Sequence, residues 1–178
     1  MKRPFLIILI LMCGCATTPA VKKGFNFGSY GRIGVIKFVS NSSYRESGNS
    51  VSDEFIRQLM KREKQVFEIV NPMSDSIYSY QIMAGGYKVD GIITGTVTKY
   101  VPDGEDTVYL KNDEGKIVSE MFIKESEVGV SAKFIDGATG VVLWSDSYTY
   151  SGFSVDDTIN SVVSVIVRRL EKNRYERK

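Results

Sequence analysis

Runs of apolar residues alternate with polar, turn-rich segments along the chain, and the spacing within each run predicts its secondary structure. Residues 32–39 are almost continuously apolar and β-branched, which is typical of a strand covered on both faces. Further runs predict strands over residues 66–71 and 89–101, the latter because it is rich in threonine and isoleucine. Residues 128–135 alternate between apolar and polar, and residues 141–150 follow the turn sequence DGATG as an antiparallel partner. These segments supply the strands of one sheet.

Two helices are predicted between the early strands. Ser50, followed three residues later by Asp53, has the spacing of a helix N-cap, and apolar residues recur on one side as far as residue 64. A second helix is expected over residues 73–84, with the glycine pair 85–86 at its end. Each helix therefore connects two predicted strands.

The most regular helix follows the last strand. Ser154 is its predicted cap, and Asp157 stands at the capping-box position. Its apolar face comprises Ile159, Val162, Val163, Ile166, Val167 and Leu170. The predicted order is β-α-β-α-β-β-β-α, a single-domain α/β sandwich with a mixed sheet over residues 32–171 and a basic tail over residues 172–178.

Residues 106–124 predict a hairpin that turns at residues 112–115, within an acidic stretch. Two carboxylate clusters lie in this stretch: Asp103, Glu105 and Asp106, and Asp113 with Glu114. Such groups can in principle bind a hard cation or form an acid/base pair. Neither cluster has the alternating oxygens of a calcium loop, and both fall in predicted turns, so a solvated turn is the preferred interpretation.

The start of the chain has the layout of an export signal. Met1 to Pro4 form a short basic head, and residues 5–12 are an unbroken apolar stretch. This stretch is too short to span a bilayer, which takes roughly twenty residues, but it matches the core of a secretory signal peptide. Residues 1–14 are therefore predicted to be removed on export.

The stretch MCGC resembles the bacterial lipobox, in which an apolar residue and two small residues precede a cysteine. Met12 replaces the usual leucine, and Cys13 replaces alanine or serine. The resemblance implies cleavage after Gly14, attachment of diacylglycerol to Cys15, and acylation of the new amine with a fatty acid such as palmitate. An ordinary signal peptide with incidental cysteines is the alternative. Ala16, in place of the aspartate that retains lipoproteins at the inner membrane of enteric bacteria, favours the outer membrane.

Residues 15–31 are rich in small residues, glycine and lysine and show no periodicity, which predicts a lipidated tether. The segment GFNFGSYG, at residues 24–31, invites comparison with a phosphate-binding loop. Such a loop follows a strand and opens a helix, whereas this segment leads into the strand at residues 32–39. A short tether that keeps the domain near its membrane is the interpretation that remains.

Composition removes several functional classes. Loss of Lys2 and Arg3 with the signal lowers the number of basic residues from 23 to 21, which equals the 21 acidic residues. A neutral exported domain lacks the basic footprint that nucleic acid requires. The chain has no histidine, and the lipid consumes the one cysteine left after cleavage, which excludes Ser-His-Asp and Cys-His catalysis, Cys/His zinc sites and disulfides. We therefore expect no enzymatic activity, no metal and no cofactor other than the covalent lipid on Cys15.

Trp144, Tyr148 and Tyr150 stand at even spacing on one face of the last predicted strand. Two interpretations are open for this row. Either it packs beneath a helix, which we prefer, or it forms an exposed aromatic binding surface.

Three separated pieces of sequence resemble the CsgG-like group of envelope lipoproteins, which includes the curli secretion channel subunit and the LpoB-like activator of penicillin-binding proteins. The pieces are GRIGVIKFV, VDGIITGTVTKY and AKFIDGATGVVLWSDSYTYSG, and the resemblance extends over residues 31–170. The matching positions are Asp90, Gly95, Val97, Asp136, Thr139, Gly140, Leu143, Trp144 and Ser145. These are motifs of a fold, and the resemblance implies a non-enzymatic periplasmic domain that binds other envelope proteins.

Two departures from this group bear on the role. Channel subunits contribute two long amphipathic hairpins to a membrane pore, whereas the one candidate hairpin here, residues 106–124, carries charges along its length. LpoB-like activators carry a long proline-rich linker, whereas this tether is short. The sequence favours an outer-membrane adaptor or regulator of an envelope assembly, with homo-oligomerisation open. The alternatives are an oligomeric component of a secretion channel and an enzyme acting on cell-wall glycan.

Overall fold

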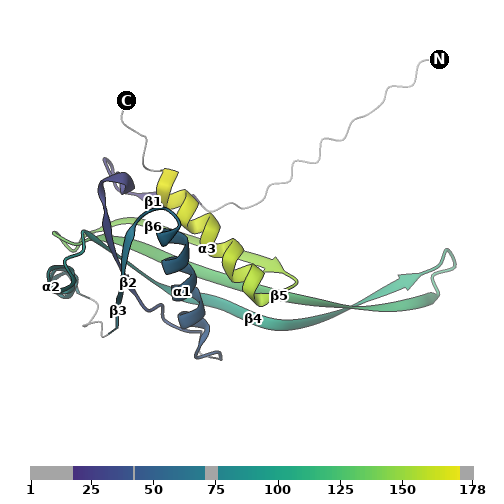
Figure 1. The fold of residues 1–178 in the computed structure, drawn as a ribbon. Coiled ribbons are helices and arrows are strands. Elements are labelled where there is room, and N and C mark those ends of the chain that lie inside the picture. The colour runs from purple at the N-terminus through teal and green to yellow at the C-terminus, as the bar shows by residue number, and fades with distance from the viewer. Residues whose placement is uncertain (1–17, 42, 71–75, 173–178) are drawn as a thin grey trace, which may run out of the picture.

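The computed structural model describes residues 18–41, 43–70 and 76–172 of the 178-residue chain. They form a six-stranded sheet with the strand order β1-β6-β5-β4-β2-β3 (Figure 1). The strands are β1 (Ala20–Val21), β2 (Arg32–Ile36), β3 (Gln65–Ile69), β4 (Gly91–Lys111), β5 (Ile117–Asp136) and β6 (Val142–Gly152). The helices are the 3-10 helix η1 (Phe27–Ser29) and the α-helices α1 (Ser47–Met60), α2 (Ile77–Tyr87) and α3 (Val155–Lys172).

The sheet is mixed, and the predicted α/β class is confirmed. β2 runs parallel to β3 and to β4, whereas β4, β5 and β6 form an antiparallel ladder. The apolar run predicted over residues 32–39 forms β2, whose residues 33–36 are all buried between its two neighbours. A strand paired and covered on both sides needs apolar side chains throughout, which explains the continuous run.

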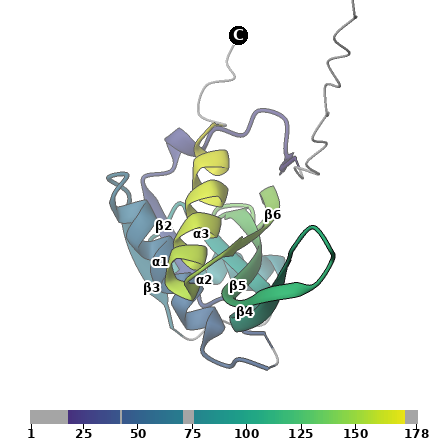
Figure 2. The same ribbon diagram turned by 90° about the vertical axis from the view of Figure 1, so that its right-hand side faces the viewer.

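Helices cover both faces of the sheet. α1 and α3 lie together on one face, as Figures 1 and 2 show, and the main core lies between them and the sheet. α2 packs on the opposite face over a smaller cluster that includes Ile36, Ile92 and Ile135. Alternate residues of the central strands thus point into different cores, as the two-residue period of a strand requires.

α1 begins at Ser47, so the prediction that Ser50 caps it is wrong. The first turn is held instead from the preceding segment, because Ser40 Oγ accepts from the Gly48 N–H at 3.0 Å and Ser47 Oγ accepts from the Asn41 N–H at 3.0 Å. Gly48 lies so close to the carbonyl of Phe38 that a Cβ there would meet the oxygen at 2.1 Å. Tertiary contact, which local spacing does not reveal, sets this helix start.

α2 extends further than predicted. It is capped by Ser76, whose hydroxyl accepts from the Ser79 N–H at 3.2 Å, and it continues through the glycine pair 85–86 to Tyr87. Residues 73–75 of the predicted helix lie outside the described residues. The helix ends at Lys88, which is left-handed with a φ of 53°, because the N–H of Val89 then reaches the carbonyl of Ala84 at 3.0 Å.

The second half of the predicted tether belongs to the folded domain. Ala20 and Val21 pair with Ser145 and Trp144 of β6. Phe27 is only 1% exposed. Its ring meets that of Phe134 edge to face, with 5.4 Å between centroids. The aromatic side chains of this segment carry no helical or strand period, and the apolar site that receives them is formed by distant residues.

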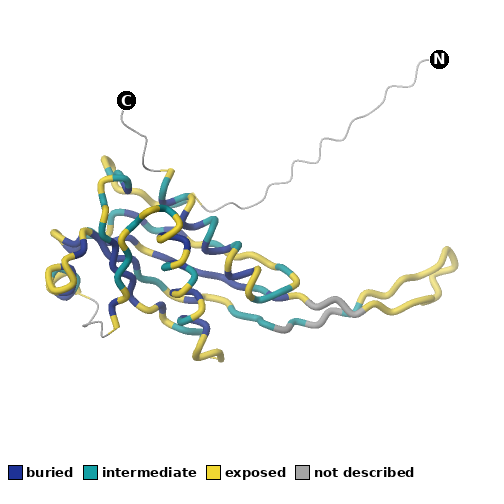
Figure 3. Tube along the Cα trace, in the orientation of Figure 1, coloured by how far each residue is buried: buried dark blue, intermediate teal, exposed yellow. Residues whose placement is uncertain are grey.

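Figure 3 shows the consequence for burial, with a buried centre and an exposed extension at one end. Among the described helices, none combines the length and the apolar character needed to cross a membrane.

Candidate functional site

The exposed extension is a hairpin arm, which we define as residues 102–125 of β4 and β5. β6 reaches its last pair with β5 at Ser126, opposite Gly152, and the two longer strands continue as a ribbon that leaves the domain (Figure 1). The predicted hairpin and its turn at 112–115 are confirmed. Asn112 Oδ1 accepts from the N–H groups of Glu114 and Lys116 at 3.1 and 2.9 Å, and Gly115 supplies the positive φ of 77° that the turn requires.

The strands are longer than predicted. Asp103, Glu105 and Asp106, which were predicted to lie in a turn, belong to β4 instead. The ladder between β4 and β5 has register shifts between Val97 and Lys99 and between Val101 and Gly104. At Gly104, a Cβ would lie 2.5 Å from the carbonyl oxygen of Glu125, so glycine allows the close approach of the strands. Such irregularities bend and twist a ribbon, and they occur where the arm leaves the domain.

Apolar side chains of the described part of the arm lie exposed on both of its faces. Six of them have exposed fractions of 37% to 62%. They are Val108, Tyr109, Leu110, Ile117, Val118 and Met121. Val108 lies opposite Met121, so these two share one face, whereas Tyr109 lies opposite Glu120 on the other. An isolated two-stranded ribbon is at best marginally stable in water, and exposed apolar side chains gathered in this way make the arm a candidate contact surface.

The base of the arm is held to the domain. Ser126 Oγ lies 2.8 Å from Thr158 Oγ1 of α3 and donates to the carbonyl of Gly152 at 3.0 Å. On the other strand, β4, the ring of Tyr100 lies 5.2 Å from that of Tyr44 in the loop before α1, measured between ring centroids. These contacts join the base of the arm to α3 and to the loop before α1.

The two predicted carboxylate clusters are not brought together. Asp113 and Glu114 lie exposed in the turn at the tip. The other cluster lies at the base of the arm, where Gly104 pairs with Glu125, and the side chains of Asp103, Glu105 and Asp106 lie outside what the structure describes. Within the described residues, no group of three or more His, Cys, Asp or Glu side chains is placed to share a metal ion.

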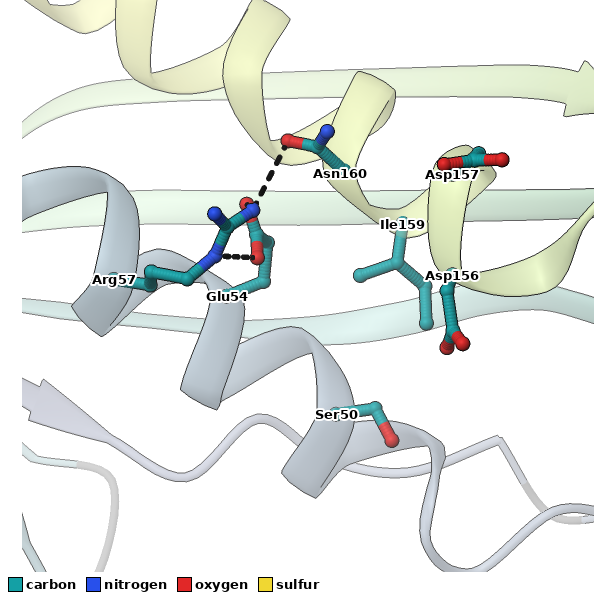
Figure 4. Close-up of a pocket in the computed structure, with 7 residues that line it drawn as sticks. All are labelled: Ser50, Glu54, Arg57, Asp156, Asp157, Ile159 and Asn160. Atoms are coloured by element: carbon teal, nitrogen blue, oxygen red, sulfur yellow. Dashed lines mark hydrogen bonds and ion pairs between the residues drawn. The ribbon is translucent and has the colours of Figure 1, made fainter.

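A second feature is a surface groove of about 330 Å³ between α1 and α3 (Figure 4). Arg57 forms two hydrogen bonds of 2.6 Å to Glu54, and one of 3.3 Å to Asn160 on the opposite helix. Gln58 donates to the same Asn160 oxygen at 2.9 Å. Asp156 and Asp157 line the far side, in the first turn of α3, where carboxylates favour the positive end of the helix dipole. The polar groups of the groove therefore hold two helices together.

A third feature is a pocket of about 350 Å³ around Tyr30 and Asp136. The Tyr30 hydroxyl donates to Asp136 Oδ2 at 2.8 Å, and Thr139 donates to Oδ1 through its N–H and its hydroxyl, both at 2.7 Å. Burial alone raises the pKa of Asp136, but these hydrogen bonds, with that from the Ala138 N–H, outweigh burial and lower it. Burial and the Asp136 carboxylate raise the pKa of Tyr30 to about 12. The cluster closes the turn between β5 and β6.

Other motif positions of the CsgG-like resemblance are structural as well. Asp90 Oδ2 accepts from the N–H groups of Gly31 and Arg32 at 2.9 and 2.8 Å, which fixes the entry of β2 beside β4. A Cβ on Gly95 would lie 2.1 Å from the carbonyl oxygen of Ser131. Gly140 has a positive φ of 67° in the turn after Asp136. The motif therefore specifies how strands meet, which explains why it predicts architecture better than role.

The aromatic residues predicted to share one face of β6 become more exposed along the strand. Trp144 is buried, Tyr148 packs under the guanidinium of Arg169 at 4.9 Å from the ring centre, and Tyr150 is exposed. The preferred interpretation, packing beneath a helix, holds for the first two. Phe153, just beyond the row, is 85% exposed, and the sequence pattern gave no sign of it.

Cys13, Gly14 and Cys15, with the predicted cleavage site and lipid attachment, lie outside the described residues.

No protein-family model matches the chain, and no curated protein sequence matches it. Solved structures do. The PelC dodecamer from Paraburkholderia phytofirmans superposes with a TM-score of 0.62 at 16% identity, over 86% of this chain and 96% of that chain. The fold is similar to that of PelC.

Two further structures share this fold with PelC. Lipoprotein GNA1162 from Neisseria meningitidis has a TM-score of 0.50 at 18% identity, over 79% of this chain and 98% of that one. The hypothetical protein CT253 from Chlamydia trachomatis has a TM-score of 0.53 at 9% identity, over 83% and 99%. At these identities the matches show the fold, and the coarser part of the sequence resemblance is confirmed: this is a fold that bacterial lipoproteins use.

Proposed function

We propose that this chain is an outer-membrane lipoprotein, attached through Cys15, that acts on the periplasmic face as a non-enzymatic adaptor or regulator of an envelope assembly. The observation that carries the proposal is the hairpin arm, a ribbon that extends beyond the last residue pair of β6 and has apolar side chains exposed on both faces. The shared fold with lipoprotein GNA1162 and the lipobox-like stretch support the anchor. The CsgG-like motifs support the assignment to envelope assembly.

The arm is tested by site-specific photo-crosslinking in cells. A photoreactive amino acid is placed at Tyr109 or Val118 on the arm, or, as matched controls, at Tyr78 or Ile82 on the exposed side of α2. Tyr78 and Ile82 are 79% and 59% exposed, against 50% and 62% for Tyr109 and Val118, so a difference in exposure does not favour the arm. We expect a discrete adduct with another envelope protein from the arm positions only. Equal adducts at all four positions, or adducts from α2 alone, would remove the arm as the contact surface.

The anchor is tested by replacing Cys15 with serine. Three acyl chains give stable membrane attachment, whereas the unlipidated chain lacks a hydrophobic anchor of this kind. We expect the variant to move from the membrane fraction to the soluble fraction. A Cys13→Ser variant is the matched control and should stay membrane-bound. If the Cys15→Ser protein stays in the membrane fraction as well, the lipid is not the anchor.

A second candidate is a ring-forming subunit of an export or secretion assembly, and the fold shared with the PelC dodecamer favours it. Native mass spectrometry of the detergent-extracted lipidated protein separates the two roles. A large closed oligomer supports the subunit, and a monomer or dimer supports the adaptor.

A further inference from the structure

The attachment point of the domain is closer to the lipid than the sequence pattern predicted. β1 pairs with β6, and the N–H of Lys22 donates to the carbonyl of Leu143 at 2.8 Å, so the chain is fixed to the domain from Ala20 onward. On the proposed function, the lipid is on Cys15, and the intervening chain spans at most about 17 Å when fully extended. The surface around β1 must therefore lie within this distance of the bilayer.

That surface also includes the C-terminal end of α3 and the turn after α1. Figures 1 and 2 both place β1, η1 and the end of α3 at the upper end of the molecule. Arg62 forms an ion pair of 2.8 Å with Glu171, which joins the turn after α1 to the last turn of α3. Lys64 donates to the carbonyl of Tyr30 at 2.5 Å, which joins the same turn to the segment after η1. We call this surface the anchor end.

The anchor end is basic. Four lysines lie exposed on it: Lys22, Lys23, Lys61 and Lys172. Of the carboxylates there, Glu171 is paired with Arg62, and Asp136 accepts hydrogen bonds from Tyr30 and Thr139. Asp90 accepts from the N–H groups of Gly31 and Arg32, and Glu63 lies exposed. The hairpin arm has the opposite balance. Its sequence contains seven acidic residues and three basic ones, namely Asp103, Glu105, Asp106, Asp113, Glu114, Glu120 and Glu125 against Lys111, Lys116 and Lys124.

We propose that the anchor end docks on a bilayer surface that carries anionic phospholipid. The short connection brings the four lysines to the headgroups, and each lysine near an anionic surface contributes roughly a fivefold preference for the docked state. The acidic arm is repelled from the same surface. The arm leaves the side of the molecule in Figure 1, whereas the anchor end is at the top. Docking therefore orients the domain so that the arm extends beside the membrane without touching the lipids.

The test uses the full-length lipidated protein in vesicles. Because the lipid occupies Cys15, a cysteine introduced by Ser29→Cys at the anchor end, or by Asp113→Cys at the arm tip, takes up a fluorophore at one site. Energy transfer to a headgroup-labelled lipid is measured in phosphatidylcholine alone and in a mixture with phosphatidylglycerol. We expect transfer from position 29 to exceed that from position 113, to rise with phosphatidylglycerol, and to fall again at high salt.

Charge reversal provides the matched comparison. K22E/K23E should lower the ratio of docked to undocked domains by more than about tenfold and abolish the response to phosphatidylglycerol. K111E/K116E makes the same charge change on the arm and should leave the response intact. A protein that floats with the vesicles but shows no lipid dependence, or an unchanged K22E/K23E response, overturns the docking inference alone. A protein that does not float with vesicles of either composition lacks the anchor, which overturns the proposed function and this inference together.

Discussion

At the residue scale, positions of the CsgG-like motifs connect strands through hydrogen bonds and tight turns. Asp136 accepts from Tyr30, more than a hundred residues earlier, and from Thr139 within its own turn. The turn DGATG is predictable from the sequence, because aspartate, threonine and glycine each have a local preference there. The hydrogen bond from Tyr30 is not predictable, because nothing in the spacing of the N-terminal segment points to a carboxylate in a distant hairpin.

The hydrogen bond between Tyr30 and Asp136 makes the stability of the fold depend on pH in both the acidic and the alkaline range. The pKa of Asp136 is lowered by folding, so its contribution to stability is present at neutral pH and is lost as the pH falls below about 4. The pKa of Tyr30 is raised from 10.0 to about 12, so its contribution is present below pH 10 and is lost as the pH rises through about 12.

Tyr30→Phe should therefore lower the free energy of unfolding at neutral pH by about 1 kcal/mol, since one partly exposed hydrogen bond is lost. It should also flatten the loss of stability between pH 10 and about 12. Urea unfolding across this range measures both effects. Tyr109→Phe, which removes an exposed hydroxyl on the arm, is the control and should match the parent. If Tyr30→Phe loses stability between pH 10 and about 12 as the parent does, the Tyr30 hydroxyl is not the cause of that loss.

Glycine positions give a second test at this scale. A Cβ on Gly95 meets the carbonyl oxygen of Ser131 and the ring of Phe38 at 2.1 and 2.4 Å, so Gly95→Ala should cost about 1–3 kcal/mol of stability. Gly86, inside α2, has no atom within 4 Å of the same position, and Gly86→Ala should stabilise by up to about 1 kcal/mol. The midpoints of thermal unfolding of the two variants test this difference. Equal shifts of the midpoint in the same direction would contradict the close packing at Gly95.

At the element scale, the sequence predicts best where one element carries its own pattern. α3 is predicted almost residue by residue because its apolar side chains recur over about three turns, from Ile159 to Leu170, and all of them belong to the main core. The start of α1 is misplaced because its first turn is held by Ser40 and Asn41, which lie outside the helix. The segment before β2 is missed for a similar reason, since Phe27 is buried against Phe134 and against residues of α3.

The burial of that segment makes a testable difference between two phenylalanines. Phe27→Ala should lower the free energy of unfolding by about 3–5 kcal/mol, because it empties a site in the main core. Phe153→Ala changes the same atoms at a position that is 85% exposed, and it should stay within about 0.5 kcal/mol of the parent. Denaturant titrations of the two variants measure this difference. A mild effect of Phe27→Ala would mean that the segment is not part of the cooperative unit.

At the scale of the whole molecule, the hydrophobic cores that stabilise the domain do not include the arm. Both core clusters of the described residues are drawn from the sheet, the helices and the segment after β1, and the arm contributes to neither. The hairpin could be predicted from the sequence, but its projection could not. That depends on where β6 stops, and β6 ends at Gly152 because the chain turns there into α3.

Removing the arm should therefore spare the fold. A variant in which residues 106–123 are replaced by Asn-Gly should keep its unfolding midpoint or gain slightly, because a shorter connection lowers the entropic cost of closure by roughly 0.6 kcal/mol per halving. The same variant should no longer co-purify with the envelope protein that crosslinks to Tyr109 and Val118 of the parent. Circular dichroism during thermal unfolding gives the first readout. Loss of cooperative unfolding would mean that the arm belongs to the folding unit.

The pairing of β1 with β6 also has a kinetic consequence. β4 and β5 are joined by a tight turn, whereas Ala20 and Ser145 stand at opposite ends of the domain's sequence. Contacts between near neighbours form early, and those that close a long loop form late, so β1 should be the last strand to join the sheet. With the lipid on Cys15, as proposed above, the chain between the lipid and the domain is longer by the whole segment up to β2 until this step occurs. The proposed anchor then implies that the chain folds at a greater distance from the membrane and is drawn in toward it by the final step of its own folding.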